Sequence, residues 1–470
     1  MEQTKNTDAH DSNATGMSRR GFLKLGGAFA VGGMTALSLP GASQAGGIGS
    51  GKKIQELKNE LFWRKVRKQF IIDPDVVYMN IGTTGSMPIP VLESYERYNR
   101  LAAYHPKTYE EELGAEFGLP NQREKLAAQF GCNSDEICLS YNTTDGLDTV
   151  VYGLDLQAGD EILTTHHEHI AALSPLNVRQ DRDGINVKYL EIPVLDVQDP
   201  TQFVDLFESN VTSNTKAILF SHITYKTGTK LPAKELCAMA RSHGITSIVD
   251  GAHTPGMIQL NFHDIGCDFY AGSGHKWQCG PGGTGILYLR NQGGDLPKFW
   301  TQNSSLYTIV AQPANNVRGA FDVAYSVQYR GELNIAGLLA MVDACDMWED
   351  IGRDRIEKYV LGLSSYLKGA LKAKFGDQGT HFAPDAPQFL SGLTAFNPFD
   401  DVTDATKAET FVQRLQDETG FQIRYTNFRV HLSDSVDAYA LRISTHIFHT
   451  RDQIDELVDA MYDLYLTMGP

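Results

Sequence analysis

The chain is short of positive charge and of long apolar runs, and each shortage excludes a class of protein. Lysine and arginine total 41 against 57 aspartate and glutamate residues, so the net charge is −16. Because binding to nucleic-acid phosphates needs a basic face, nucleic acid is excluded as a principal partner. The most apolar N-terminal stretch, residues 25–39, is too short and too rich in glycine to be a stable membrane span.

Cysteine is also sparse. The six cysteines are scattered along 470 residues with no C-x-x-C pair, which excludes a small disulfide scaffold and predicts ordinary core residues. With 42% hydrophobic and 21% charged residues, the composition is typical of a soluble globular protein. The length allows a large core and more than one domain.

In the first 45 residues, a charged segment, an apolar stretch and small residues follow one another in the order typical of an export signal. Arg19 and Arg20 stand in the run S-R-R-x-F-L-K directly before the weakly apolar stretch, and small residues follow up to Ala45. This arrangement resembles a twin-arginine signal peptide, which implies the twin-arginine translocation machinery as a partner and a periplasmic or otherwise exported protein. A disordered tail that contains two arginines is the alternative.

The rest of the chain divides by its pattern into a linker with an N-terminal helix (46–77), a large domain (78–335) and a smaller C-terminal α+β domain (336–470). Short β-rich runs alternate with helical stretches in the large domain. The last four of these runs are 217–220, 246–249, 268–271 and 285–289. This alternation predicts an α/β fold with a doubly wound, mainly parallel sheet. Ligands bind outside the carboxyl ends of such strands, so the chemistry is expected directly after these runs.

One candidate anion site follows the apolar run 137–139. Thr143 and Thr144 stand there at the start of a helical stretch, where hydroxyls and free backbone N–H groups can bind a phosphate. Thr and Asp also cap helices routinely, so an ordinary helix cap remains the alternative reading.

A lysine and a carboxylate complete the pattern. Asp250 comes directly after the run 246–249, where a carboxylate can keep a pyridine nitrogen protonated. Lys276 lies in S-G-H-K-W before the glycine-rich G-P-G-G-T-G, and a buried lysine beside a cationic ring is neutral enough to bind an aldehyde. Ser273 and His275 flank it as potential phosphate donors. Together these features predict pyridoxal 5'-phosphate (PLP) as the cofactor.

At these motifs the chain resembles the class V aminotransferase family of fold-type I PLP enzymes, and within it the proteins similar to isopenicillin N epimerase. The resemblance runs from Tyr78 to near the C-terminus. It implies that Lys276 is the Schiff-base lysine, that Asp250 binds the pyridine nitrogen, that His253 lies beside the pyridine hydroxyl and that His169 stacks on the ring. It also implies phosphate contacts from Thr143, Thr144, Ser273 and His275.

For the substrate, the family pattern R-x-S places Arg442 as the residue that binds a carboxylate, with Arg424 as a second candidate. Arginine suits this task because its planar guanidinium binds a carboxylate through two parallel hydrogen bonds. The segment 80–85 resembles the family loop that closes over the substrate, which implies contacts from Asn80 and Thr83.

The run His166-His167-Glu168-His169 has a rival reading as a metal site, since imidazole and carboxylate are common ligands. Neighbouring residues on a strand point to opposite faces, so few of these four side chains can converge. No metal is therefore expected.

The resemblance also implies a homodimer, with two departures from the family pattern. Where many members have a Gly-Thr loop that reaches the neighbour's phosphate, this chain has Arg330-Gly331-Glu332. The segment 425–436, which matches the loop of the catalytic cysteine in cysteine desulfurases, contains no cysteine.

The function expected from the sequence is therefore that of an exported enzyme acting at the alpha carbon of an amino acid or peptide-derived amine. Aminotransferase and epimerase are the leading reactions, and a carbon–sulfur lyase or desulfurase is the alternative. A non-catalytic exported binding protein of the same fold is the alternative from another class.

Overall fold

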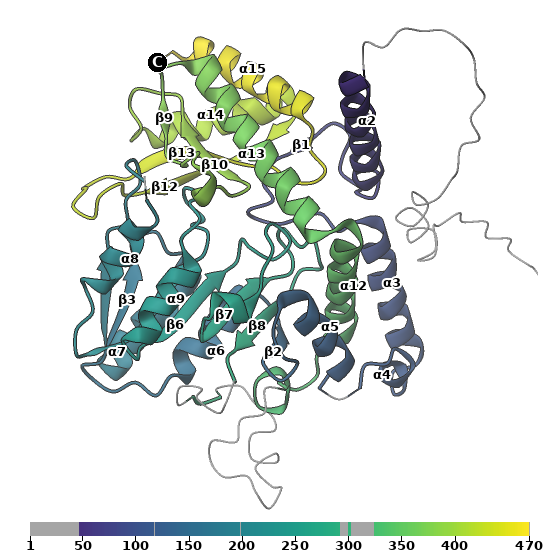
Figure 1. Cartoon of the computed structure of the whole chain (residues 1–470), viewed down its shortest axis with the longest axis vertical. Helices are drawn as coiled ribbons and strands as arrows, with labels where there is room; N and C mark the ends of the chain where they lie inside the picture. Colours follow the sequence, from purple (N-terminus) through teal and green to yellow (C-terminus); the bar gives the residue numbers. More distant parts are fainter. Residues whose placement is uncertain (1–46, 117, 198, 292–298, 302–323, 470) are drawn as a thin grey trace, which may run out of the picture. The chain divides into compact units, whose positions relative to one another are not determined.

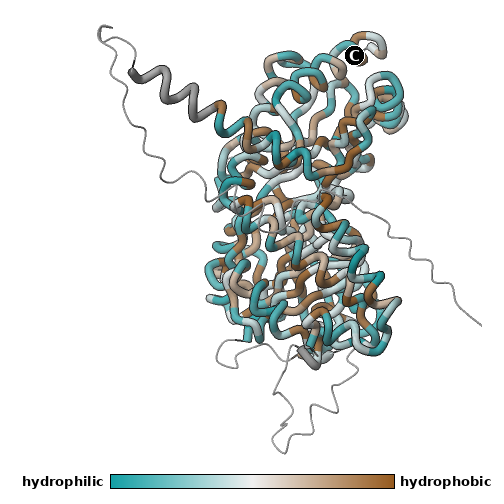
Figure 2. Tube along the Cα trace, turned by 90° about the vertical axis from the view of Figure 1, so that its right-hand side faces the viewer, coloured by the Kyte–Doolittle hydropathy of each residue, from teal (hydrophilic) through white to brown (hydrophobic). Residues whose placement is uncertain are grey.

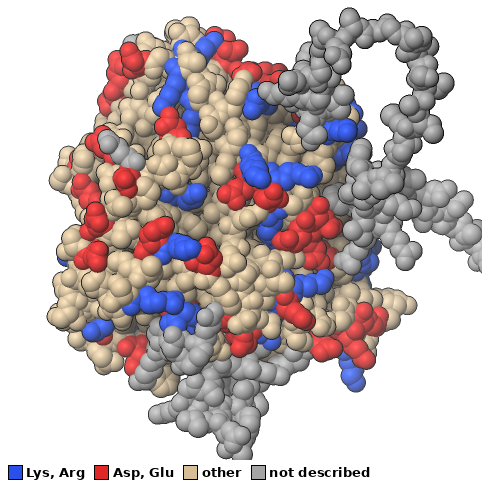
Figure 3. Space-filling model, viewed as in Figure 1, with Lys and Arg blue, Asp and Glu red and all other residues tan. Residues whose placement is uncertain are grey.

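The fold is described from a computed structural model covering residues 47–469, except 117, 198, 292–298 and 302–323. The predicted export signal (1–45) lies outside the described residues. In the part that the structure describes, no helix is both long and apolar enough to cross a bilayer. Lys/Arg and Asp/Glu are interspersed on the face shown in Figure 3.

The largest of the sheets has seven strands and lies in the lower half of the view in Figure 1. In spatial order its strands are β2 (Ile137–Ser140), β8 (Gly285–Leu289), β7 (Phe269–Ser273), β6 (Thr246–Gly251), β5 (Thr215–Ser221), β3 (Glu161–Thr165) and β4 (Asn186–Leu190). All are parallel except β8, which is antiparallel to both neighbours. Since β7 and β8 are joined by a loop without a crossover helix, the chain reverses there. The predicted mainly parallel sheet is confirmed.

Helices cover both faces of this sheet: α6 (Thr143–Gly153), α7 (Ile170–Asp183), α8 (Thr201–Glu208), α9 (Ala233–Ser242) and α10 (Phe262–Ile265). Leu219 of β5 belongs to one buried cluster with Leu147 of α6 and Leu176 of α7. The next residue, Phe220, points to the other face, where its ring centroid is 6.1 Å from that of Phe207 in α8. This alternation gives the doubly wound arrangement.

A smaller antiparallel sheet lies in the C-terminal part, in the order β12 (Arg424–Phe428), β13 (Ala438–Ser444), β10 (Leu393–Asn397) and β9 (Thr380–His381). It is accompanied by α13 (Arg353–Phe375), α14 (Ala405–Thr419) and α15 (Arg451–Met468). Helix α15 begins where Thr450 and Gln453 form a capping box. The smaller α+β part expected from the sequence is thus present, while the domain limits at 77 and 335 stay predictions.

The N-terminal segment joins this C-terminal part. Strand β1 (Val77–Tyr78) pairs in parallel with β11 (Phe421–Gln422), and Met79 belongs to the C-terminal buried core. The backbone N–H of Ser444 donates to the carbonyl of Met79 at 2.9 Å. The segment 80–85 is therefore held beside the end of β13.

The remaining elements are α2 (Gly47–Arg67), α3 (Ile89–Tyr104), α4 (Tyr109–Glu112), α5 (Pro120–Phe130), α12 (Ile335–Ile351), a π-helical turn (Ala324–Gln328) and a 3-10 turn (Pro387–Phe389). Figure 2 shows that short hydrophobic and hydrophilic stretches alternate along the chain.

Candidate active site

A cavity of about 480 Å³ opens at the carboxyl ends of the parallel strands. It is lined by residues that follow β2, β3, β5, β6 and β7, and by residues of β12 and β13. All the site residues predicted from the sequence line it except Asn80, namely Thr83, Thr143, Thr144, His169, Asp250, His253, Ser273, His275, Lys276, Arg424 and Arg442. Asn80 reaches the site through a hydrogen bond to Arg442. The structure thus brings together residues from both sheets.

Lys276 lies in the loop that joins β7 to β8. The loop is fastened to the 80–85 segment, because the backbone N–H of Gly85 donates to the carbonyl of His275 at 2.7 Å. A Cβ on Gly85 would lie 2.0 Å from the carbonyl oxygen of Lys276, so this close approach requires glycine. Burial lowers the pKa of Lys276 to about 8, with Asp250 opposing the shift. A substantial fraction of the amine is therefore neutral near pH 8.

Asp250 faces the cavity from β6. Its Oδ1 accepts a hydrogen bond from the backbone N–H of Ala252 at 2.9 Å, and 4% of the residue is exposed. Burial raises the pKa of this carboxyl, while the Ala252 N–H and the nearby Lys276 lower it. A buried carboxylate with one hydrogen bond from the protein has capacity left for a cationic ring N–H.

The N-terminus of α6 and the end of β7 form an anion site. The hydroxyls of Thr143 and Ser273 are 2.7 Å apart, and Asn142 caps the helix by accepting from the backbone N–H of Asp145. Nδ1 of His275 is buried without a hydrogen-bond partner. Hydroxyls, a helix N-terminus and an unpartnered imidazole together suit a phosphate. The cap of α6 is therefore Asn142, whereas Thr143 contacts Ser273 and lines the cavity.

His169 caps α7 through Nδ1, which accepts from the backbone N–H of Ala171 at 3.1 Å. Its ring meets that of Tyr225 edge-on, with centroids 4.8 Å apart and an interplanar angle of 82°. Burial, with Lys276 next in effect, lowers the pKa of His169 to about 4. The imidazole is therefore neutral, and its Nε2 carries the proton.

The other members of the His-His-Glu-His run point elsewhere. Nε2 of His167 is 3.0 Å from the carbonyl of Arg429, whereas Glu168 accepts hydrogen bonds from Ser221 and Thr165. His166 faces the carbonyl of Val430. Over the described ranges, no three His, Cys, Asp or Glu side chains are grouped as metal ligands.

Arg442 is 2% exposed, and in the part of the chain that the structure describes it forms no ion pair. Nη1 donates to the carbonyl of Tyr225 at 3.1 Å, and Nη2 donates to Thr83 Oγ1 at 3.1 Å and Asn80 Oδ1 at 3.3 Å. Its Nε is buried without a partner. Because a buried guanidinium needs an anion, this arrangement suits a substrate carboxylate. Arg424 is exposed and donates to the same Thr83 hydroxyl at 3.3 Å.

The sequence profile described as aminotransferase class V matches residues 77–457. The chain belongs to this family. The isopenicillin N epimerase of Streptomyces clavuligerus is 30% identical over 407 residues, 85% of this chain and 97% of the relative. That of Amycolatopsis lactamdurans is 28% identical over 412 residues, 86% of this chain and 98% of the relative. A probable cysteine desulfurase of Halalkalibacterium halodurans is 28% identical over 417 residues, 84% and 96% of the two chains.

Two solved structures have the same fold as this class V chain. A C-DES mutant with glycine covalently linked to its PLP cofactor superposes with a TM-score of 0.71 at 24% identity, covering 84% of this chain and 99% of that one. The apo cysteine desulfurase of Thermococcus onnurineus NA1 gives 0.69 at 21% identity, covering 86% and 98%.

The residues of this class V member fit PLP. The cavity offers an amine with a lowered pKa, a buried carboxylate for the ring nitrogen and an anion site for the phosphate. Two buried nitrogens without partners, Nδ1 of His275 and Nε of Arg442, lie among the lining residues, and each needs a partner that the described protein does not supply.

The Arg330 segment has a role within its own chain. The Arg330 guanidinium forms an ion pair with Asp145 in the first turn of α6 and donates to Thr149 Oγ1 at 2.8 Å. It therefore braces the helix whose N-terminus forms the anion site. The homodimer stays a prediction.

Sequence reasoning missed Thr426 and Asn427, which line the cavity from β12. Thr426 follows Arg424 by two residues, and strand alternation places both side chains on one face. For Thr426, this two-residue spacing from Arg424 was the signal available in the sequence.

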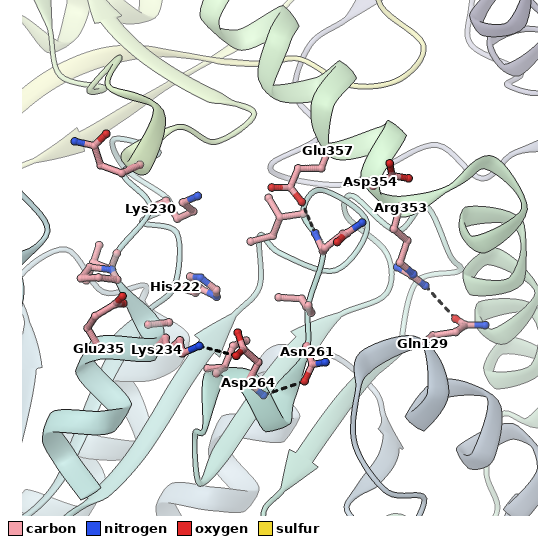
Figure 4. Close-up of a pocket in the computed structure, with 18 of the residues that line it drawn as sticks. Gln129, His222, Lys230, Lys234, Glu235, Asn261, Asp264, Arg353, Asp354 and Glu357 are labelled. Atoms are coloured by element: carbon pink, nitrogen blue, oxygen red, sulfur yellow. Dashed lines mark hydrogen bonds and ion pairs between the residues drawn. The ribbon is translucent and has the colours of Figure 1, made fainter. Parts of the chain in front are cut away.

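A larger cavity of about 790 Å³ lies between α9, α10 and the start of α13, and shares no lining residue with the site (Figure 4). Several of its charged side chains form an ion pair or hydrogen bonds within it. Lys234 binds Asp264 at 2.6 Å, Arg353 donates to Gln129 at 3.0 Å, and Glu357 accepts from the Gln259 backbone.

Proposed function

We propose that the chain is a PLP-dependent enzyme that transforms the alpha carbon of an amino acid or peptide-derived amine, as an aminotransferase or an epimerase. The cofactor follows from family membership and from the fit of the cavity. One observation carries the proposal: Lys276, Asp250 and the unpaired Arg442 line the same cavity. When bound, the cofactor supplies an electron sink for the bond that breaks at the alpha carbon.

The side chains divide the work among them. The neutral amine of Lys276 would hold the cofactor through its aldehyde and would serve as the base for the proton on the alpha carbon. Asp250 would keep the ring nitrogen of the cofactor protonated. Arg442 orients the substrate by binding its carboxylate, and Thr83 and Asn80 hold the guanidinium in place.

The two leading reactions differ in where the proton is returned. Inversion at the alpha carbon requires an acid on the face opposite Lys276. Tyr225 and His169 are further titratable groups that line the cavity. The kinship with two isopenicillin N epimerases supports an epimerase.

The carbon–sulfur lyase or desulfurase is the second candidate, and probable cysteine desulfurases among the relatives support it. A desulfurase needs a reactive thiol at the cavity. No cysteine is among the described lining residues, and burial raises the pKa of the nearby Cys279 thiol. The epimerase or aminotransferase reading is therefore preferred.

Hydrogen exchange at the alpha carbon separates these reactions. The PLP-loaded protein is incubated in deuterated water with a panel of amino acids and short peptides with free amino termini. We expect deuterium at the alpha carbon, read by proton NMR, with inversion from an epimerase and an oxo acid from an aminotransferase. Released sulfide identifies the lyase. A coloured protein that exchanges no proton on any substrate would favour the non-catalytic binding protein and contradict the proposal.

We also propose that the chain works outside the cytoplasm, on the strength of the S-R-R-x-F-L-K run. Cells producing the full chain are expected to hold a shortened form in the periplasmic fraction. The double variant Arg19→Lys, Arg20→Lys keeps the charge and should remain cytoplasmic at full length. Equal distribution of both proteins would refute the role of the arginine pair.

A further inference from the structure

Among the described residues, one hydrogen bond reaches the ring of His253, and it comes from Trp277, the residue after Lys276. Nδ1 of His253 lies 3.2 Å from Nε1 of Trp277, and only 3% of His253 is exposed. An indole nitrogen can donate a hydrogen bond but cannot accept one. Nδ1 of His253 must therefore be the acceptor, and it carries no proton in this contact.

The imidazole is also neutral. Burial lowers the pKa of His253 well below its ordinary value, and Lys276, Arg442, His169 and His275 all act in the same direction. A neutral imidazole carries one proton, so with Nδ1 unprotonated the proton is on Nε2. Within the described chain Nε2 has no hydrogen-bond partner, and His253 lines the cavity with Lys276 and Asp250. The N–H is thus available to a group bound in the cavity.

Close packing keeps the Trp277 indole in one orientation, with its N–H directed at His253. The indole is fully buried, and its centroid is 5.4 Å from the edge-on ring of His446. His446 Nε2 also lies 2.9 Å from the Trp277 carbonyl. A Cβ on Gly392 would approach the indole to 2.6 Å, so the backbone packs directly against the ring. The indole has little room to turn its N–H away from His253.

We propose that Trp277 is a positioning residue that fixes His253 in the Nε2–H tautomer, so that His253 donates to the oxygen of the cofactor's pyridine hydroxyl. The family resemblance implies that His253 lies beside that oxygen. The hydrogen bond from Trp277 to His253 adds a residue that selects the tautomer. The inference rests on the proposed function for its ligand, whereas the tautomer is a property of the protein itself. Lys276 would then bind the cofactor aldehyde, and the next residue, Trp277, would orient the hydrogen bond from His253 to the neighbouring hydroxyl oxygen.

The tautomer can be measured directly in the wild-type protein. Histidine labelled with ¹⁵N is incorporated, and two-bond ¹H–¹⁵N correlation spectra of the cofactor-free and PLP-loaded protein report which ring nitrogen carries the proton. His253→Gln identifies the signals of His253 by their loss. We expect Nε2–H in both states, and a proton on Nδ1 would overturn the proposal. A protein that binds no PLP would refute the proposed function but leave the cofactor-free spectrum interpretable.

Removal of the indole donor tests the consequence for the cofactor. Trp277→Phe should give a mixture of the two tautomers. It should also raise, by about one pH unit, the midpoint at which the bound cofactor changes its visible absorbance. The direction follows because a donor stabilises the form with more negative charge on the oxygen, which is the deprotonated form.

Two comparisons separate this effect from general damage to the fold. Trp348→Phe removes a buried indole that donates to the carbonyl of Gly256, and should leave both the His253 tautomer and the midpoint unchanged. In His253→Gln the amide donates without any tautomer, so adding Trp277→Phe should move the midpoint no further. A shift of the same size in that background would show that Trp277 acts by another route and overturn the proposal.

Discussion

Replacing Lys276 with alanine is expected to give a protein that forms no covalent bond to the cofactor and does not turn over substrate. The amine of this lysine loses its proton near pH 8, and the lysine lines the cavity together with Asp250. Without it the aldehyde has no covalent attachment and the alpha carbon loses its base. We expect kcat to fall by at least the roughly 100- to 10,000-fold that a positioned acid–base group contributes. Cofactor that stays attached to the protein after borohydride reduction and denaturation measures the first effect, and substrate turnover measures the second.

The pH dependence of cofactor capture in the wild type checks the same assignment. Because burial lowers the pKa of Lys276 to about 8, the neutral fraction of the amine increases as the pH rises towards that value. Capture should therefore accelerate up to about pH 8 and then level off. Lys230→Ala is a matched control, since this lysine lines the other cavity, and it should leave colour and turnover unchanged. A Lys276→Ala protein that still becomes covalently labelled with the cofactor on borohydride reduction would contradict the assignment.

The position of the site was predictable because the parallel strands carry it. Asp250 and Ser273 end neighbouring strands, and the carboxyl ends of parallel strands share one edge of the sheet. The order of strand runs and helical stretches along the chain was sufficient for this. The lysine loop was readable as well, because no helical stretch separates 268–271 from 285–289 and the loop between them has to reverse the chain.

The contacts between the two sheets were not readable from local patterns. Arg442 donates to Thr83, and the segment that carries Thr83 follows β1. Strand β1 has two residues and pairs with β11, which also has two. Strands this short have no detectable periodicity, so the resemblance to a family, rather than the pattern, pointed to the 80–85 segment. The Trp277–His253 contact is similar, because it depends on how two loops pack rather than on either motif alone.

Replacing Arg442 with lysine is expected to weaken substrate use while leaving the cofactor in place. Lysine keeps the positive charge but lacks the planar fork, and it cannot hold a carboxylate while also donating to Thr83, Asn80 and the Tyr225 carbonyl. Loss of charge-assisted hydrogen bonds costs about 1.5–3 kcal/mol, which is roughly a 10- to 150-fold fall in kcat/KM. The bound cofactor should keep its visible absorbance, because the lysine that holds it is unchanged. Steady-state kinetics and the absorption spectrum of the same sample measure both results.

Arg424→Lys provides the matched comparison, because the two arginines stand on neighbouring strands and share the Thr83 hydroxyl. Arg424 is exposed, so solvent screens its charge and we expect at most about a fivefold fall in kcat/KM. If the two variants lose equal activity, or if Arg424→Lys loses more, the carboxylate is bound at the mouth of the cavity. If Arg442→Lys loses colour as well as activity, Arg442 supports the cofactor. The expected asymmetry follows from burial: a guanidinium removed from water and without a protein carboxylate gains most from the anion that the substrate brings.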